Sequence, residues 1–204
     1  MASNIQKGYL VLADISGYTF FLANTELDHA QIVISYLLEA MVEKLGTALT
    51  ISKLEGDAVF AYVEESKLPN GESLMELIDQ TYFVFRDKVE TMYKGASCSC
   101  RACRTINTLD LKFMVHHGDF IVLQVAGIKD AWGSDVNLLH RLLKNGVVEA
   151  TGWRGYALFT SQGLQGIQPD EKSFIQQNES YEHLGNVKTY IMDMDARYQA
   201  MKAS

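Results

Sequence analysis

The chain has 204 residues, of which 48% are hydrophobic and 10% aromatic, so it can build a sizeable core and is not disordered on compositional grounds. Its formal charge of −7 argues against a general binder of nucleic acids or anionic membranes, because no basic surface is implied. The sequence has neither a signal peptide nor a run approaching the roughly 20 apolar residues of a membrane helix, which predicts a cytoplasmic protein.

The first elements alternate between strands and a long helix. Residues 8–16 form a short apolar run that ends near Asp14, which is typical of a buried strand with a carboxylate at its end. Apolar residues recur at helical spacing over 26–46 and predict an amphipathic helix. Residues 47–63 then predict two strands joined by a tight turn at Glu55-Gly56.

The second half of the chain continues with a predicted helix over residues 71–94 and a polar, irregular segment over 94–108. Residues 109–127 predict a hairpin that turns near 117–119. The remaining elements are expected in this order: a helix over 134–145, a strand over 155–161, a small helix and a final strand over 187–194.

The order β-α-β-β-α-β, extended by a further strand and helix, indicates the fold class. It predicts an α+β, ferredoxin-like sandwich, in which helices cover one face of a mainly antiparallel sheet. Nothing in the sequence marks a linker or an internal repeat. We therefore expect a single domain over 1–204, with a cysteine-containing insert at about 95–107.

Two carboxylates stand at predicted strand ends. Asp14 closes the first strand, and Asp57 opens the strand after the glycine turn. If these strands are neighbours, the two carboxylates meet at one edge of the sheet and repel each other unless a cation lies between them. Mg²⁺ suits such a pair because it prefers hard oxygen ligands. The alternative is that each aspartate bonds backbone amides of its own turn.

A polar pair lies on the predicted helix over 134–145. Asn137 and Arg141 are four residues apart and therefore share one helix face. An amide and a guanidinium there could orient a ribose and neutralise a phosphoryl group, since guanidinium matches phosphate geometry. The alternative is a solvent-facing polar stripe.

All three cysteines, Cys98, Cys100 and Cys103, fall within six residues. An odd, clustered set is not a disulfide framework, but three thiolates at C-x-C-x-x-C spacing could bind Zn²⁺. We expect His116 or His117 as the fourth ligand of a closed zinc site. His29, early in the first long helix, is expected to be a surface residue. The alternative is three reduced thiols on a flexible loop.

Three stretches in order resemble the catalytic domain of the class III nucleotidyl cyclases, the adenylate and guanylate cyclases: "LADISGYTFF" (12–21), "KLEGDAVFAY" (53–62) and "DAWGSDVNLLHR" (130–141). They are similar to that family's first metal motif, second metal motif and substrate helix. The strand end "MVHHGDF" and the strand "GNVKTYIM" also look like parts of that domain. Together with the inserted C-x-C-x-x-C cluster, they resemble an uncharacterised bacterial branch of the family.

The resemblance implies a role for each motif residue. Asp14 and Asp57, helped by the Ile15 carbonyl, would hold two Mg²⁺ or Mn²⁺ ions. Lys53 and Asp130 would read the adenine edge, which favours ATP. As a list, the implied catalytic residues are Asp14, Asp57, Asn137 and Arg141, with Asn137 on the ribose and Arg141 on the phosphoryl group.

The implied reaction converts ATP to cyclic AMP and pyrophosphate, by attack of the ribose 3′-oxygen in a site shared by a homodimer. Leu184 stands where active relatives often have a lysine that contacts the triphosphate, and Lys188 is four residues away. A weak or inactive nucleotide-binding or sensor module, with the cysteines as a metal or redox site, is therefore the alternative function. A purely structural dimer is a third.

Overall fold

The protein is described from a computed structural model, which covers residues 4–68, 70–98, 100–167 and 173–203. The helices and strands are, in chain order, β1 (Ile5–Ser16), α1 (Tyr18–Ala23), α2 (Leu27–Leu45), β2 (Thr50–Glu55), β3 (Ala58–Glu64), η1 (Glu65–Lys67), α3 (Gly71–Gly95), α4 (Arg101–Thr105), η2 (Ile106–Thr108), β4 (Asp110–Val125), β5 (Ile128–Trp132), α5 (Ser134–Arg141), α6 (Val147–Thr151), β6 (Tyr156–Thr160), β7 (Ile175–Tyr181), β8 (Gly185–Asp193) and α7 (Met194–Ala203).

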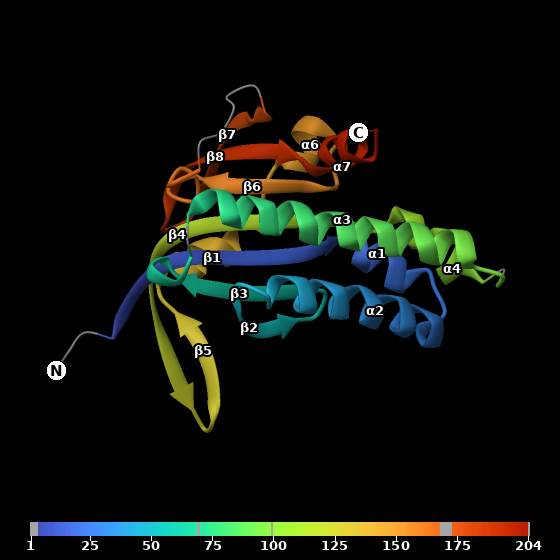
Figure 1. Cartoon of the computed structure of the whole chain (residues 1–204), viewed down its shortest axis with the longest axis horizontal. Helices are drawn as coiled ribbons and strands as arrows, with labels where there is room; N and C mark the ends of the chain where they lie inside the picture. Colours follow the sequence, from blue (N-terminus) through green and yellow to red (C-terminus); the bar gives the residue numbers. More distant parts are fainter. Residues whose placement is uncertain (1–3, 69, 99, 168–172, 204) are drawn as a thin grey trace.

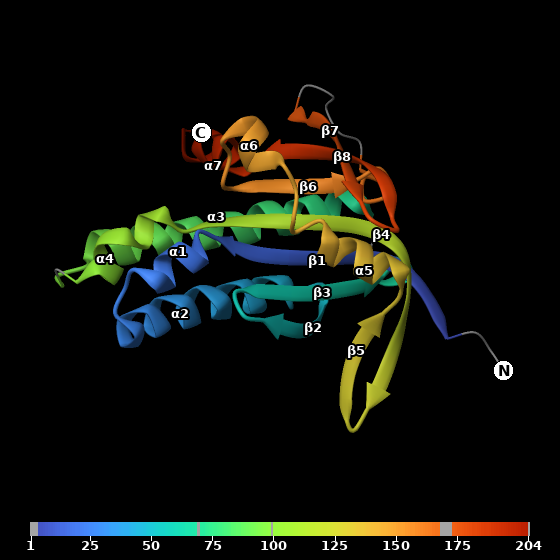
Figure 2. The same cartoon turned by 180° about the vertical axis from the view of Figure 1, so that it is seen from behind.

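The strands form one mainly antiparallel sheet in the order β2-β3-β1-β4-β6-β8-β7, and β5 pairs with the far part of β4. β4 and β6 run parallel, whereas β1 is antiparallel to both β3 and β4. The long helices α2 and α3 lie side by side across one face (Figure 1). This arrangement confirms the predicted α+β class with a mainly antiparallel sheet, but helices lie on both faces rather than one, because α5 packs on the other side (Figure 2).

The apolar pattern of β1 explains how the sheet is covered. Tyr9, Val11, Ala13 and Ile15 belong to the core beneath α2 and α3. The alternate residues Leu10 and Leu12 belong to a second core, on the face where α5 packs (Figure 2). Successive strand residues point to opposite faces, so Asp14 continues the row of Leu10 and Leu12 on the α5 face.

Local sequence signals set the ends of the main helices. Asn70 caps α3, because its side-chain oxygen accepts a hydrogen bond from the Ser73 backbone N–H at 2.8 Å. Along α3 the buried residues Leu74, Leu77, Ile78, Tyr82 and Phe85 recur at helical spacing. The predicted helices over 26–46 and 71–94 therefore form almost as expected.

The predicted turn near 117–119 is wrong. β4 runs through these residues, which pair with β1 in the register Gly8↔Gly118 and Tyr9↔His117. The chain reverses instead at Ala126 and Gly127, which both have positive φ. Gly118 serves a close approach rather than a turn, because a Cβ there would lie 2.2 Å from Oδ2 of Asp135.

Other boundaries also differ from the predictions. The helix expected over 134–145 ends at Arg141. The sequence patterns missed the short helices α4 and α6, strand β7 and the C-terminal helix α7. Turns follow β6 over 161–166 where a small helix was expected, and residues 168–172 lie outside the described part. Within the described residues, none of the helices has the length and apolar character to span a membrane.

Candidate functional site

The two predicted carboxylates lie next to each other at one end of the sheet. Asp14 pairs with Ala58 of β3, the residue directly after Asp57. The Ile15 backbone N–H donates to the Asp57 carbonyl oxygen at 3.3 Å, which ties the end of β1 to the β2–β3 turn. The expectation that the first and third strands are neighbours is therefore confirmed.

A lysine that the sequence patterns did not single out completes this group. Lys112 is the β4 partner of Asp14, and its Nζ lies 3.1 Å from Oδ2 of Asp14, with both side chains mostly buried. Burial, helped by the negative charge of Asp14, raises the pKa of Asp57 to about 6, and Lys112 opposes the rise. Two carboxylates and one ammonium thus share a poorly hydrated corner.

The donor set of this corner fits a divalent cation. Asp14 and Asp57 supply carboxylate oxygens, the hard ligands that Mg²⁺ and Mn²⁺ prefer. Poor hydration, and after it the charge of Asp14, disfavours ionised Asp57, and Lys112 offsets only part of this cost. A cation bound there would favour the ionised form of both aspartates.

A second group forms around Lys53 and Asp130. Lys53 Nζ lies 2.8 Å from Asp130 Oδ2, and Ser52 Oγ donates to Asp130 Oδ1 at 2.8 Å. Neighbouring strand residues normally point to opposite faces, but a bulge between Ile51 and Lys53 lets both Ser52 and Lys53 reach the same carboxylate. The structure therefore brings the two predicted base-reading residues together, across 77 positions of sequence.

These residues line a cavity of about 390 Å³ between β2, β5 and α5. Its lining residues are Lys53, Asp130, Ala131, Trp132, Gly133, Val136, Asn137 and His140. A cavity of this size is in the range that holds a small organic ligand. Lys53, Asp130 and Asn137, predicted as substrate residues, thus share one cavity.

Charge is balanced inside this cavity. Partial burial disfavours the Lys53 ammonium, but hydrogen bonds to Asp130 and Glu55 outweigh burial and raise the pKa of Lys53. Burial opposes ionisation of Asp130 as well, but the bonds from Lys53 and Ser52 hold its pKa below the ordinary value. Lys53 is thus a hydrogen-bond donor and Asp130 an acceptor at neutral pH.

His140 and Glu55 were also missed by the sequence patterns. His140 Nδ1 lies 3.2 Å from Glu55 Oε2, and burial lowers the pKa of this histidine. Glu55 also lies 3.0 Å from Lys53, so it connects the histidine of α5 to the lysine of β2. His140 stands beside Arg141 at the end of the stretch 130–141, so its position could have drawn attention in the sequence. Helical spacing alone, however, does not place His140 beside β2.

Arg141 lies at the last residue of α5, one turn after Asn137, and its side chain is exposed. The carboxylate corner and the cavity lie near each other on the β2–β3 hairpin. Asp14 pairs with Ala58 of β3, and Lys53 pairs with Phe60, two residues or about 7 Å further along the same strand. The β4–β5 hairpin turns back so that Asp130 reaches Lys53. The structure therefore forms two neighbouring groups, Asp14 with Asp57 and Lys53 with Asp130 and Asn137.

The predicted fourth partner of the cysteines is corrected by the structure. His116 and His117 are buried in the sheet, where His116 Nδ1 lies 2.7 Å from Thr160 Oγ1 and His117 packs edge-on against Tyr9. His29, expected on the surface, is half-buried, and its Nδ1 lies 3.0 Å from Cys100 Sγ. The pairing brings the start of α2 to a segment about 70 residues later, which no local pattern encodes.

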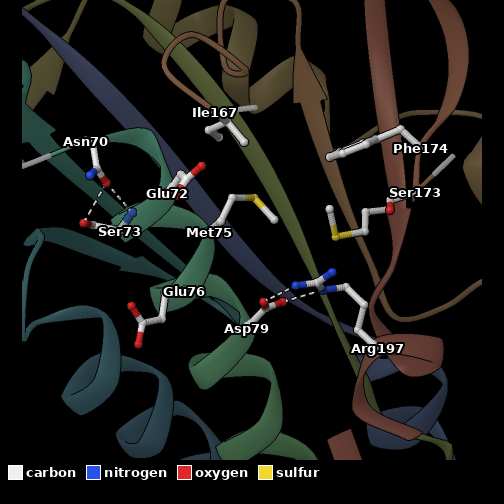
Figure 3. A pocket seen from close by; sticks show the side chains of 11 residues that line it. Asn70, Glu72, Ser73, Met75, Glu76, Asp79, Ile167, Ser173, Phe174 and Arg197 are labelled. Atoms are coloured by element: carbon white, nitrogen blue, oxygen red, sulfur yellow. Dashed lines mark hydrogen bonds and ion pairs between the residues drawn. The ribbon is translucent and has the colours of Figure 1, made fainter. Parts of the chain in front are cut away.

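A larger cavity of about 550 Å³ lies beside α3 (Figure 3). Its charged groups include Asp79 and Arg197, whose side chains pair through two hydrogen bonds and so neutralise each other. It is lined by none of the residues singled out from the sequence. We therefore place the candidate site at the carboxylate corner and the Lys53 cavity.

Solved structures similar to this chain include nucleotidyl cyclases. The guanylyl cyclase Cya2 matches with a TM-score of 0.73, 12% identity and coverage of 94% of both chains. The adenylyl cyclase CyaB from P. aeruginosa matches with a TM-score of 0.63, 15% identity and coverage of 92% of this chain and 94% of that chain. A bacterial light-regulated adenylyl cyclase matches with a TM-score of 0.70 and 11% identity, but the chain, although 97% covered, spans only 56% of that protein. The fold is therefore cyclase-like.

Sequence comparison gives the family. A family model described as "Protein of unknown function (DUF2652)" matches residues 34–151, more than half of the chain, so the protein belongs to that family. A relative from Mycobacterium tuberculosis (strain ATCC 25618 / H37Rv), "Uncharacterized protein Rv2561/Rv2562", is 27% identical over 165 residues, which cover 79% of this chain and 73% of the relative. The family match includes Lys53, Asp57 and the whole of α5, and begins after Asp14 and His29.

Proposed function

We propose that the protein is a nucleotidyl cyclase that converts ATP to cyclic AMP and pyrophosphate. The observation that carries the proposal is the joint presence, on a cyclase-like sheet, of the Asp14–Asp57 pair and the cavity with Lys53, Asp130 and Asn137. The first group suits divalent ions and phosphates, and the second suits a base and a ribose.

In this mechanism Asp14 and Asp57, with the Ile15 carbonyl, would hold two divalent cations. Bound there, the cations would lower the pKa of the ribose 3′-hydroxyl and balance charge on the attacking and leaving oxygens. The residues of the chain otherwise act by position and charge. Asn137 orients the ribose, and Arg141 stabilises the charge that develops on the phosphoryl group.

The preference for ATP rests on Lys53 and Asp130. The adenine edge offers a ring nitrogen that accepts a hydrogen bond and an amino group that donates one. The Lys53 ammonium would donate to the nitrogen, and the Asp130 carboxylate would accept from the amino group. Because the two side chains already pair at 2.8 Å, the base would replace part of an existing polar contact rather than meet unpaired charges.

Lys112, rather than Lys188, is the cation that we assign to the phosphates. Lys112 lies on the sheet face that carries Asp14, where the two side chains already pair. Lys188 and Tyr190 are two residues apart on β8, so they point to the same face of the sheet, and Lys188 stacks over the Tyr190 ring. Tyr190 packs against the core on the α3 side, so Lys188 points to the face opposite Asp14. A phosphate chain on the carboxylate corner could therefore reach Lys112 but not Lys188.

The site would be shared between two copies of the chain. In this arrangement, which the resemblance to the cyclases implies, the carboxylate corner of one copy would face the Lys53 cavity of the other across a two-fold axis. The β4–β5 hairpin projects from the body as an arm (Figures 1 and 2). It carries the exposed apolar side chains Val125, Ile128 and Trp132, which a second copy would cover.

Complementation tests both the reaction and the shared site. With ATP and Mn²⁺, chromatography of the products should show cyclic AMP, and Asp14→Ala or Arg141→Ala alone should lower its rate at least 100-fold. Mixing these two variants should restore about a quarter of wild-type activity, because half of the dimers contain one intact site. The matched control mixes Asp14→Ala with Asp57→Ala, which damage the same half and should restore nothing.

The outcomes separate the proposal from its alternative, a nucleotide-binding module without turnover. Cyclic nucleotide from the wild type, lost in each variant and recovered only in the first mixture, supports the shared cyclase site. Tight binding of a non-hydrolysable ATP analogue without product would support the binding module and refute the enzyme. Turnover without recovery in the first mixture, with both variants folded and dimeric, would refute the shared site.

A further inference from the structure

The three cysteines and His29 converge on one point. One ligand atom each from His29, Cys98, Cys100 and Cys103 lies within 4.8 Å of the other three. His29 Nδ1 is 3.0 Å from Cys100 Sγ and 4.0 Å from Cys98 Sγ. We call these four residues the Cys₃His cluster. It lies where the start of α2 meets the chain that runs from the end of α3 into α4, at the end of the molecule that Figure 1 marks with α4.

The chemistry of these donors selects the metal. A tetrahedral zinc ion with Zn–S bonds of about 2.3 Å and a Zn–N bond of about 2.0 Å places its ligands roughly 3.5–3.8 Å apart. The measured separations of 3.0 and 4.0 Å bracket that range. Three thiolates and an imidazole form a soft set, which favours zinc over the Mg²⁺ and Mn²⁺ that suit the carboxylate corner.

Neighbouring groups hold the cysteines in place. The Cys100 backbone N–H points at Cys98 Sγ at 3.3 Å, and the Cys103 N–H points at Cys100 Sγ at 3.4 Å. Such donors stabilise thiolates and orient ligands around a metal. The Glu26 carboxylate, three residues before His29, accepts from the Arg101 N–H at 3.1 Å, and so docks the start of α4 against the start of α2.

We propose that the Cys₃His cluster binds one structural Zn²⁺. Four protein ligands close the coordination shell, so the ion would not bind substrate. The ion would join α2 to the end of α3, which lie side by side over the sheet. It would also fix the chain that leaves β1, because α1 begins only four residues after Asp14 and leads directly into α2. The proposal uses no residue of the cyclase site and stands or falls separately.

Metal analysis of the purified full-length chain tests the proposal. We expect about one zinc ion per chain, measured by inductively coupled plasma mass spectrometry. Exchange with Co²⁺ should give the intense visible bands of tetrahedral thiolate-bound cobalt. In competition with a chromophoric chelator, His29→Ala should lower zinc affinity at least tenfold, whereas His29→Cys, which supplies a fourth thiolate, should keep the stoichiometry.

The matched control is His183→Asn. His183 lies in an exposed turn with positive φ, a conformation that asparagine tolerates, so this variant should bind zinc like the wild type. Purified protein that contains no zinc and takes up none from micromolar ZnCl₂ would overturn the proposal. So would a disulfide among the cysteines in freshly purified protein, or equal zinc affinity in His29→Ala and the wild type.

Discussion

Replacing Asp57 with asparagine should stabilise the metal-free protein while removing its proposed activity. Burial and the nearby charge of Asp14 raise the pKa of Asp57 from 3.8 to about 6. The folded state therefore binds this proton more tightly than the unfolded state does. The ionised carboxylate costs no stability below pH 3.8; its cost grows between pH 3.8 and about 6, where only the folded state keeps the proton, and is complete above about 6.

The size of the effect follows from the two pKa values. A move from 3.8 to about 6 corresponds to about 3 kcal/mol of destabilisation at pH 8. Asp57 is only half-buried, so solvent screening reduces this figure, and we expect about 1–2 kcal/mol. Because asparagine resembles the protonated acid, Asp57→Asn should recover that amount. For a chain of this size the melting temperature would rise by about 2–8 °C.

Differential scanning fluorimetry at pH 8 and pH 5, without added divalent cations, measures the effect. The variant should melt above the wild type at pH 8, and the difference should shrink to about half at pH 5, where folded Asp57 is mostly protonated but unfolded Asp57 is still ionised. Asp119→Asn is the control, because this exposed aspartate lies outside the corner and should change little at either pH. An equal or lower melting temperature for Asp57→Asn at pH 8 would refute the electrostatic account of the corner.

Three further predictions can be checked with few variants. Lys112→Met should move the acid limb of the cyclase pH profile to higher pH, because Lys112 lowers the pKa of Asp57. It should also raise KM for ATP, whereas the control Lys188→Met should change neither the pH profile nor KM. Gly118→Ala should lower the free energy of unfolding by about 1–3 kcal/mol, measured by denaturant titration, because its Cβ would collide with the Asp135 carboxylate. Removing zinc from the Cys₃His cluster should lower the free energy of unfolding by about 4 kcal/mol, relative to protein with free zinc at about 1,000 times the Kd. The loss should appear as a lower melting temperature, which added ZnCl₂ restores.

Much of the fold could be predicted, because its signals are local. The apolar residues of α2 and α3 recur at helical spacing, and a glycine marks the β2–β3 turn. The same logic placed Asp14 beside Asp57, since a β-α-β-β order makes the first and third strands neighbours. The turn near 117–119 failed because Gly118 fills a tertiary need, the close approach of Asp135, that a turn signal imitates.

The rest of the candidate site depends on contacts between distant segments. Ser52 joins Lys53 on Asp130 only because β2 contains a bulge, which the letters "ISKLE" do not announce. His29 meets Cys100 because α2 and α3 lie side by side. The helical pattern could show that His29 was off the buried stripe, but not which segment lay beside it.

The positions of the two lysines bear on whether the missing lysine at Leu184 excludes catalysis. Leu184 lies in the β7–β8 turn, and Lys188 points to the α3 face, so neither supplies a cation to the carboxylate corner. Lys112 is already there, mostly buried and paired with Asp14. Divalent ions bound to Asp14 would neutralise its carboxylate. The Lys112 ammonium could then leave Asp14 and pair with a phosphate oxygen instead. The chain thus carries positive charge for the phosphates on the correct face, and the loss at Leu184 does not by itself favour the binding module over the enzyme.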